Sequence, residues 1–249
     1  MKQTIRLGKG YGDCRDEVER IINQFDTTGD TVHDGRNTIK SFDTPRGRWN
    51  VKRYHRPSFF NRFVYTLLRQ PKGLRAFTYP EHVLAAGFET PAPVAYVEQR
   101  CCGLLDYSFF ISEQCPYSRR FYEFGNARVD DCRDIVKDFA RFTAGLHEAG
   151  IYHRDYSPGN ILFDRVDGQW HFSIVDINRM EFGPVDIQKG CANFARLWGQ
   201  PEWFVQLAQD YAQARSADPQ QCIEFVMAAR AKFWKPRAKH FNLPYTLRF

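Results

Sequence analysis

The sequence lacks both a long hydrophobic run and a recognisable leader. A membrane-spanning helix needs roughly 20 consecutive apolar residues, and no run of that length occurs in the chain. Residues 1–8 also lack the apolar core of a signal peptide. We therefore expect a cytoplasmic protein. Near the C-terminus lies a basic run, which is more often a solvated face: Lys232, Lys235, Arg237, Lys239 and His240. Such a run could also bind lipid phosphates, so peripheral contact with the inner membrane stays open.

The cysteines are too scattered for a disulfide framework or a zinc site. There are seven, an odd number, and the adjacent pair Cys101 and Cys102 is poorly placed to cross-link distant segments. The others do not follow the spacing of metal ligands. We expect free thiols in a reducing compartment.

The excess of charge of one sign is small. The chain has 35 Lys and Arg residues against 29 Asp and Glu residues, a formal net charge of +6. This balance favours anionic partners, but no nucleic-acid-binding motif accompanies it, so we expect no nucleic-acid partner. The 43% hydrophobic and 16% aromatic content is enough for one large domain or for two lobes.

One stretch carries a catalytic pattern. Asp155 follows His153 by two residues, and Asn160 follows five residues later and leads into the apolar run 161–163. Residues 164–169 have the composition of a turn, and a second apolar run, 172–175, ends at Asp176. Two short strands joined by a turn would bring Asp155, Asn160 and Asp176 around one point.

These three side chains suit phosphoryl transfer from a nucleotide. One carboxylate accepts the hydroxyl proton, while an amide oxygen and a second carboxylate hold magnesium, which prefers hard oxygen ligands. The pattern H-x-D-x-x-x-x-N, followed by a strand ending in Asp, matches the catalytic loop and metal-binding Asp of protein-kinase-like enzymes. We expect Asp155 and Asn160 to be catalytic and Asn160 and Asp176 to bind Mg2+. In the alternative interpretation, Asp155 and Asn160 are ordinary turn residues and Asp176 caps a strand. It explains the loop pattern or the strand-ending Asp alone, but not the two together.

The N-terminal half has matching candidates for the nucleotide. Two short strands flank residues 34–37, and this hairpin, with Gly35, would cover the phosphates; an ordinary hairpin is an equal alternative, because it has only one glycine. Lys52 lies in an alternating strand, 48–54, where a kinase lysine would reach the phosphates. Its partner is normally a helical glutamate. Glu81 is the only acid in the mixed helical region 57–86, but it follows Pro80 and is better interpreted as a solvated helix-end residue.

The strand-rich half gives way to a helix-rich half near Cys115. We expect a β-rich nucleotide-binding lobe at 1–115 and a helical catalytic lobe at 116–249, with the adenine bonded to backbone groups from Glu113 to Cys115. Helical spacing predicts a helix over 134–148 that ends before Gly150, with His147 structural or on the surface. Pro201 and the Asp218–Pro219 pair predict two helix starts.

The chain resembles the lipopolysaccharide kinases, the Kdo/heptose kinase group of the protein-kinase-like superfamily, and most of all a Bacteroidetes-type branch. The matching segments are residues 35–40, 51–53, 87–96, 153–160 and 175–179. The resemblance implies an α+β, two-lobed protein-kinase-like fold with a small antiparallel β-rich N-lobe and a mostly helical C-lobe. It also implies ATP with Mg2+ as donor and a sugar hydroxyl of the lipopolysaccharide inner core as acceptor, hence an anionic glycolipid or sugar partner. By it, Lys52 contacts the ATP phosphates. Ala76 departs from the pattern, since family members often have a glutamate there, eleven residues before Gly87.

Two other functions compete with this one. A kinase could act on a protein or another small alcohol, although no Ala-Pro-Glu segment follows Asp176 as in typical protein kinases. A nucleotide-binding pseudokinase is the non-catalytic alternative, and Ala76 is its main support.

Overall fold

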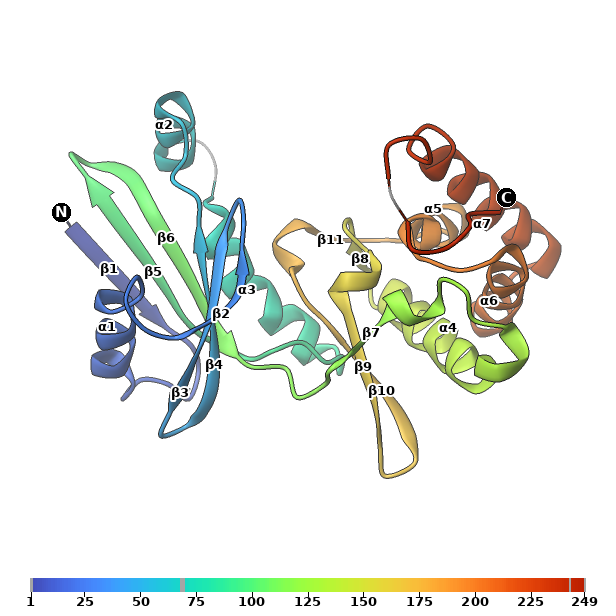
Figure 1. The fold of residues 1–249 in the computed structure, drawn as a ribbon, viewed down its shortest axis with the longest axis horizontal. Helices are drawn as coiled ribbons and strands as arrows, with labels where there is room; N and C mark the ends of the chain where they lie inside the picture. Colours follow the sequence, from blue (N-terminus) through green and yellow to red (C-terminus); the bar gives the residue numbers. More distant parts are fainter. Residues whose placement is uncertain (1, 68–69, 242, 249) are drawn as a thin grey trace. The chain divides into compact units, whose positions relative to one another are not determined.

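The chain divides into two units at residue 116. The computed structural model describes residues 2–67, 70–241 and 243–248. Unit 1 comprises Met1–Pro116 and unit 2 comprises Tyr117–Phe249 (Figure 1). The boundary falls one residue after the position expected from the sequence.

Unit 1 is built on a six-stranded antiparallel sheet. Its strand order is β1-β5-β6-β4-β3-β2, so the strands β4 and β6, distant in sequence, pair at its centre. The edge strand β1 was not predicted, because its sequence is polar and its side chains remain mostly exposed. The strands are β1 (Lys2–Leu7), β2 (Asp30–Asp34), β3 (Thr38–Thr44), β4 (Gly47–Tyr54), β5 (Pro93–Cys101) and β6 (Leu104–Glu113).

Helices cover both faces of this sheet. Helix α1 (Arg15–Asn23) buries Val18 and Ile21 in one cluster with Trp49 and Val51 of β4, as the alternation of that strand predicts. Helix α3 (Lys72–Ala85) packs closely on the other face, where a Cβ added to Gly73 would lie 2.9 Å from the Tyr96 ring. Helix α2 (Phe59–Leu67) precedes α3.

Helix α3 corrects one expectation about proline. It continues through Pro80 to Ala85 instead of stopping there. Proline in a helix interior costs about 3 kcal/mol, but α3 buries Ala76, Phe77 and Val83, and the burial of large apolar side chains offsets such a cost. Glu81 is exposed on this helix.

Unit 2 is mostly helical and carries two small sheets. The predicted helices are confirmed: α4 ends before Gly150, which has φ +70, and α6 and α7 each begin at a proline. The sheet orders are β10-β9-β7 and β11-β8. The helices are α4 (Arg133–Glu148), α5 (Ile187–Asn193), α6 (Pro201–Ala214) and α7 (Pro219–Trp234); the strands are β7 (Arg119–Arg120), β8 (Ile151–His153), β9 (Ile161–Val166), β10 (Gln169–Ile174) and β11 (Met180–Phe182).

The hairpin after the catalytic stretch is tighter than expected. The predicted turn covered residues 164–169, but β9 runs to Val166 and β10 begins at Gln169. The turn itself is Asp167 and Gly168, with φ of 49° and 79°. Two residues of positive φ match the twist of an antiparallel pair, which favours a two-residue loop.

The fold class predicted from the sequence is confirmed: an antiparallel β-rich N-terminal unit precedes a mostly helical C-terminal unit. All seven cysteines are free, and the Cys101 and Cys102 sulfurs lie 4.0 Å apart. Across the described ranges, no helix combines the length and the apolarity needed to cross a bilayer.

Candidate active site

His153, at the end of β8, ties the catalytic loop to the strand that leads to Asp176. Its Nε2 donates to the Val175 carbonyl at 2.9 Å, and its Nδ1 accepts from the Asp155 N–H at 3.1 Å. Burial lowers the pKa of His153, so the ring is neutral and keeps this tautomer. The histidine therefore positions two backbone segments.

Asn160 also joins the backbone at Asp155 to the backbone at Val175. Its Nδ2 donates to the Asp155 carbonyl at 2.8 Å, and its own carbonyl accepts from the Val175 N–H at 3.0 Å. Ile161 and Ile174 are paired in the antiparallel ladder that follows. Asp155, Asn160 and Asp176 are thus brought to one end of the β9–β10 hairpin, within unit 2.

Asp176 lies in a strained backbone conformation and is held by its neighbour. Its φ and ψ are 56° and 41°, the left-handed region, which asparagine and aspartate tolerate better than other non-glycine residues. The buried Asn178 donates to Asp176 Oδ1 at 2.6 Å. Asn178, which was not singled out from the sequence, thereby orients the predicted metal-binding carboxylate.

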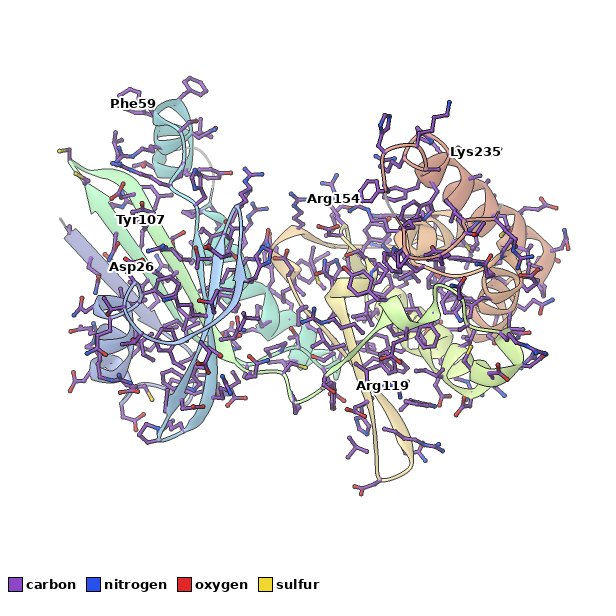
Figure 2. All side chains as sticks on the ribbon, viewed as in Figure 1. Asp26, Phe59, Tyr107, Arg119, Arg154 and Lys235 are labelled. Carbon is purple, nitrogen blue, oxygen red and sulfur yellow. The ribbon has the colours of Figure 1, made fainter. Side chains whose placement is uncertain are left out.

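The Asp155 carboxylate is paired with two arginines that the sequence did not single out. Arg196 contacts Oδ1, and Arg179 lies 3.6 Å from Oδ2. Arg196 also lies over the Phe233 ring, 5.3 Å from its centroid, which restricts the guanidinium. Arg154, next to Asp155 in sequence, instead pairs with Glu181 at 3.3 Å and is labelled in Figure 2.

A buried chain of hydrogen bonds supports the loop from behind. Asn193 donates to the His153 carbonyl at 2.9 Å, and His147 Nε2 donates to Asn193 Oδ1 at 3.0 Å. Tyr211 donates to His147 Nδ1 at 2.8 Å and accepts from Arg215 at 2.8 Å. Each group has one defined role, so the chain fixes the orientation of every member.

Burial lowers the pKa of His147 to about 4, although the hydrogen bond to Asn193 opposes the shift. His147 lies in the last turn of α4 and is buried, at 2% exposure, so of the two predicted alternatives it takes the structural one and not the surface one. Sequence reasoning could not find its partners, because Asn193 and Tyr211 lie 46 and 64 residues away.

The residues at the loop fit a magnesium ion that is shared with phosphates. The Asn160 Nδ2 donates to the Asp155 carbonyl, so the Asn160 Oδ1 takes no part in that hydrogen bond. This amide oxygen is a hard ligand of the kind that Mg2+ prefers. Asp176 adds a carboxylate. In the part of the chain that the structure describes, no group of three or more His, Cys, Asp or Glu side chains could hold a metal by itself. Such a set suits Mg2+, which keeps waters and phosphate oxygens among its ligands.

The other predicted site residues lie in unit 1. Lys52 is half-buried on β4 beside Tyr54, with its Nζ 5.4 Å from the ring centroid. Gly35 lies in the turn between β2 and β3. The Glu113 N–H donates to the Ala92 carbonyl, and the Glu113 carbonyl accepts from the Ser112 hydroxyl, both at 3.0 Å. Cys115 is buried.

The antiparallel sheet of unit 1 and the mostly helical unit 2 are the elements of a protein-kinase-like fold. The fold is similar to a solved structure described as WaaP in complex with acyl carrier protein, with a TM-score of 0.62 and 16% identity over 95% of this chain and 98% of that one. Identity at that level shows the fold alone.

Residues 25–199 match the Lipopolysaccharide kinase (Kdo/WaaP) family, and the chain belongs to that family. It is therefore a kinase with an alcohol group as acceptor, as the sequence predicted. No curated protein matches the chain.

Proposed function

We propose that this chain transfers a phosphoryl group from ATP, with Mg2+, to a sugar hydroxyl of the lipopolysaccharide inner core, on Kdo or heptose. One observation carries the proposal: Asp155, Asn160 and Asp176 are joined at one end of a hairpin by hydrogen bonds through His153, Asn160 and Val175. Family membership supports the lipopolysaccharide acceptor.

Asp155 orients the acceptor hydroxyl and receives its proton as the new bond forms. Phosphoryl transfer of this class depends mainly on positioning and electrostatics, so a carboxylate paired with arginine remains adequate. Asn160 Oδ1 and the Asp176 carboxylate hold the metal. When bound, Mg2+ neutralises charge on the nucleotide phosphates.

Unit 1 supplies the nucleotide-binding lobe in this proposal, and unit 2 the catalytic lobe. Lys52 adds a positive charge for the phosphates, and the hairpin at Gly35 covers them. The Glu113 carbonyl and the backbone of Cys115 receive the adenine.

The arginines beside Asp155 support an anionic acceptor. Arg196 and Arg179 place two positive charges at the carboxylate that faces the acceptor. A sugar acid or a phosphorylated sugar would complement these charges, whereas a neutral alcohol would not.

The test is ATP turnover with delipidated core oligosaccharide as acceptor. We expect phosphorylation of the oligosaccharide, and a loss of at least about a hundredfold in Asp155→Asn, because the proton acceptor is removed. Asp167→Asn is the matched control: it removes one carboxylate from the turn of the same hairpin, where Asn also tolerates positive φ. Equal turnover by Asp155→Asn and the control would refute the assignment.

A nucleotide-binding pseudokinase is the second candidate, and one observation favours it. Ala76, at the position of the usual glutamate, is buried on α3, so no carboxylate replaces it there. Calorimetry with ATP, with and without Mg2+, separates the two. Metal-dependent binding without turnover on oligosaccharide, protein or small-alcohol acceptors would support the pseudokinase.

A further inference from the structure

Helix α2 of unit 1 turns a group of phenylalanines toward solvent. The exposed fractions are 70% for Phe59, 77% for Phe60 and 41% for Phe63. The rings of Phe59 and Phe63 meet edge to face, with centroids 5.2 Å apart. Figure 2 shows Phe59 at the outer end of α2, pointing away from the sheet. Contiguous exposed apolar side chains of this size mark an interaction surface.

Two polar side chains beside the exposed phenylalanines anchor α2 to β6. Arg62 donates through Nε to the Leu105 carbonyl at 2.6 Å, and the Thr66 hydroxyl accepts from the Leu105 N–H at 3.1 Å. Arg62 and Thr66 are one turn apart and follow Phe59 and Phe63 by three residues each, so they lie beside these rings on the same stripe of the helix. Backbone groups of Leu105 in β6 thus hold α2 on unit 1, while the phenylalanine rings stay exposed.

A cationic cavity of about 380 Å3 lies beside the same helix, within unit 1. Its lining includes Ser58 and Asn61 of the α2 segment, and among the described lining residues none is acidic. Nearby, the Asp106 carboxylate pairs with Arg56 and offsets part of the positive charge. The lining side chains that carry or can carry positive charge are Arg36, His55, Arg56 and Lys72.

Exposed aromatic rings next to a cationic cavity match the two parts of an anionic lipid surface. Helices with an apolar aromatic face and basic neighbours lie in the boundary between headgroups and acyl chains. Basic side chains next to them attract anionic headgroups. A concave site also fits a single projecting phosphate better than it fits the flat surface of an acidic protein.

We propose that α2 and this cavity form a membrane-docking surface: Phe59, Phe60 and Phe63 enter an anionic bilayer while the cavity receives a lipid phosphate. The surface differs from the basic run at the C-terminal part of unit 2. The proposal does not rest on the kinase assignment, because docking is measured without turnover. If the acceptor is a membrane glycolipid, docking concentrates the enzyme where that acceptor lies.

The test is co-sedimentation of the full chain with vesicles of phosphatidylcholine alone or of phosphatidylcholine mixed with phosphatidylglycerol. The first variant is Phe59→Ser with Phe60→Ser and Phe63→Ser. Its matched control changes three apolar side chains exposed elsewhere, by 51%, 41% and 41%: Val32→Ser, Leu84→Ser and Val166→Ser. Thermal unfolding of each variant checks that the fold is intact.

Two further variants separate the sources of charge. One changes the cavity: Arg36→Gln, His55→Gln and Lys72→Gln. The other changes the basic run of unit 2: Lys235→Gln, Arg237→Gln and Lys239→Gln.

We expect the parent chain to bind the phosphatidylglycerol vesicles, and the phenylalanine variant to lose about tenfold or more in partitioning. The cavity variant should lose its preference for anionic over neutral vesicles, and the control should bind like the parent. No binding by the parent, equal binding by the phenylalanine variant, or loss only in the basic-run variant would each overturn the proposal.

Discussion

A hydrogen-bonded cluster in unit 2 and an ion pair in unit 1 hold their polar side chains in different ways. In unit 2, His147 and Asn193 are buried, at 2% and 5% exposure, and each hydrogen bond of their chain has a defined donor. In unit 1, the Arg46–Asp13 pair keeps 43% and 68% of its side chains exposed. Removing a buried partner leaves a polar group unsatisfied, at a cost of about 1–3 kcal/mol, whereas an exposed ion pair contributes about 0–1 kcal/mol.

This difference predicts that substitutions in the unit 2 cluster cost more stability than substitutions in the exposed pair of unit 1. The unit 2 network holds the backbone at His153, next to Asp155. Substitutions in the network should therefore alter stability and turnover together. The exposed pairs of unit 1 should tolerate change, because water replaces the lost partner.

The largest effect is expected from Gly190→Ala in α5. An added Cβ would lie 2.0 Å from the Tyr211 hydroxyl and 3.0 Å from His147 Nδ1, so it would break the hydrogen bond between them. We expect a loss of about 3 kcal/mol or more in the free energy of unfolding, measured by urea denaturation. Gly12→Ala in unit 1 is the control, since nothing lies within 4 Å of its added Cβ. Equal stability of Gly190→Ala and Gly12→Ala would show that the unit 2 cluster is no more sensitive to substitution than the exposed site in unit 1.

The next effect is a fall in stability at acid pH. His147 has a pKa lowered to about 4 in the folded state, below the ordinary value of about 6.5. The unfolded chain therefore takes up the proton first, so stability is full above about pH 6.5 and falls as the pH drops to about 4, by about 3 kcal/mol. His153 acts in the same direction.

Chemical denaturation at pH 7, 5.5 and 4 measures this fall. In His147→Gln the dependence on pH should become shallower, while His33→Gln, an exposed residue of unit 1, should leave it unchanged. A parent chain equally stable at pH 7 and 4 would contradict the neutral, buried state of His147.

A smaller effect is expected from Asn178→Ala. The change removes the amide that holds Asp176 Oδ1 but no group assigned to bind metal. We expect turnover to fall by about 10–100-fold, the range typical of a group that orients a metal ligand. The fall should be partly recovered by raising Mg2+, which a purely structural role would not show. If turnover changed neither with Asn178→Ala nor with the Mg2+ concentration, Asn178 would have no role in orienting Asp176.

The smallest effect is expected from Arg46→Gln in unit 1. It removes the exposed pair with Asp13, and we expect a change below about 1 kcal/mol in the free energy of unfolding. Urea denaturation in low and high salt measures it, since screening should shrink the difference further. A loss as large as that of Gly190→Ala would show that unit 1 is not the tolerant unit.

The sequence predicted best what is close together along the chain. Asp155, Asn160 and Asp176 lie within one loop and one hairpin, so spacing alone brought them together. Pro201 and Pro219 marked helix starts for the same local reason. Their chemical roles remain predictions.

What the sequence could not show depends on packing between distant residues. Arg196 reaches Asp155 across 41 residues, and Asn193 reaches the His153 carbonyl across 40. The polar strand β1 forms because β5 offers it an edge. Helix α3 passes Pro80 because its buried face packs on the sheet. None of these contacts leaves a periodic signal in the sequence.

The central claim is that Asn160 and Asp176, with Asp155 beside them, hold one divalent cation together with the nucleotide. Electron paramagnetic resonance of Mn2+, used in place of Mg2+, tests it most directly in titrations of the full chain with ATP. We predict a protein-bound Mn2+ signal that requires ATP, that is lost in Asp176→Asn and that persists in Asp167→Asn. An unchanged signal in Asp176→Asn would contradict the account.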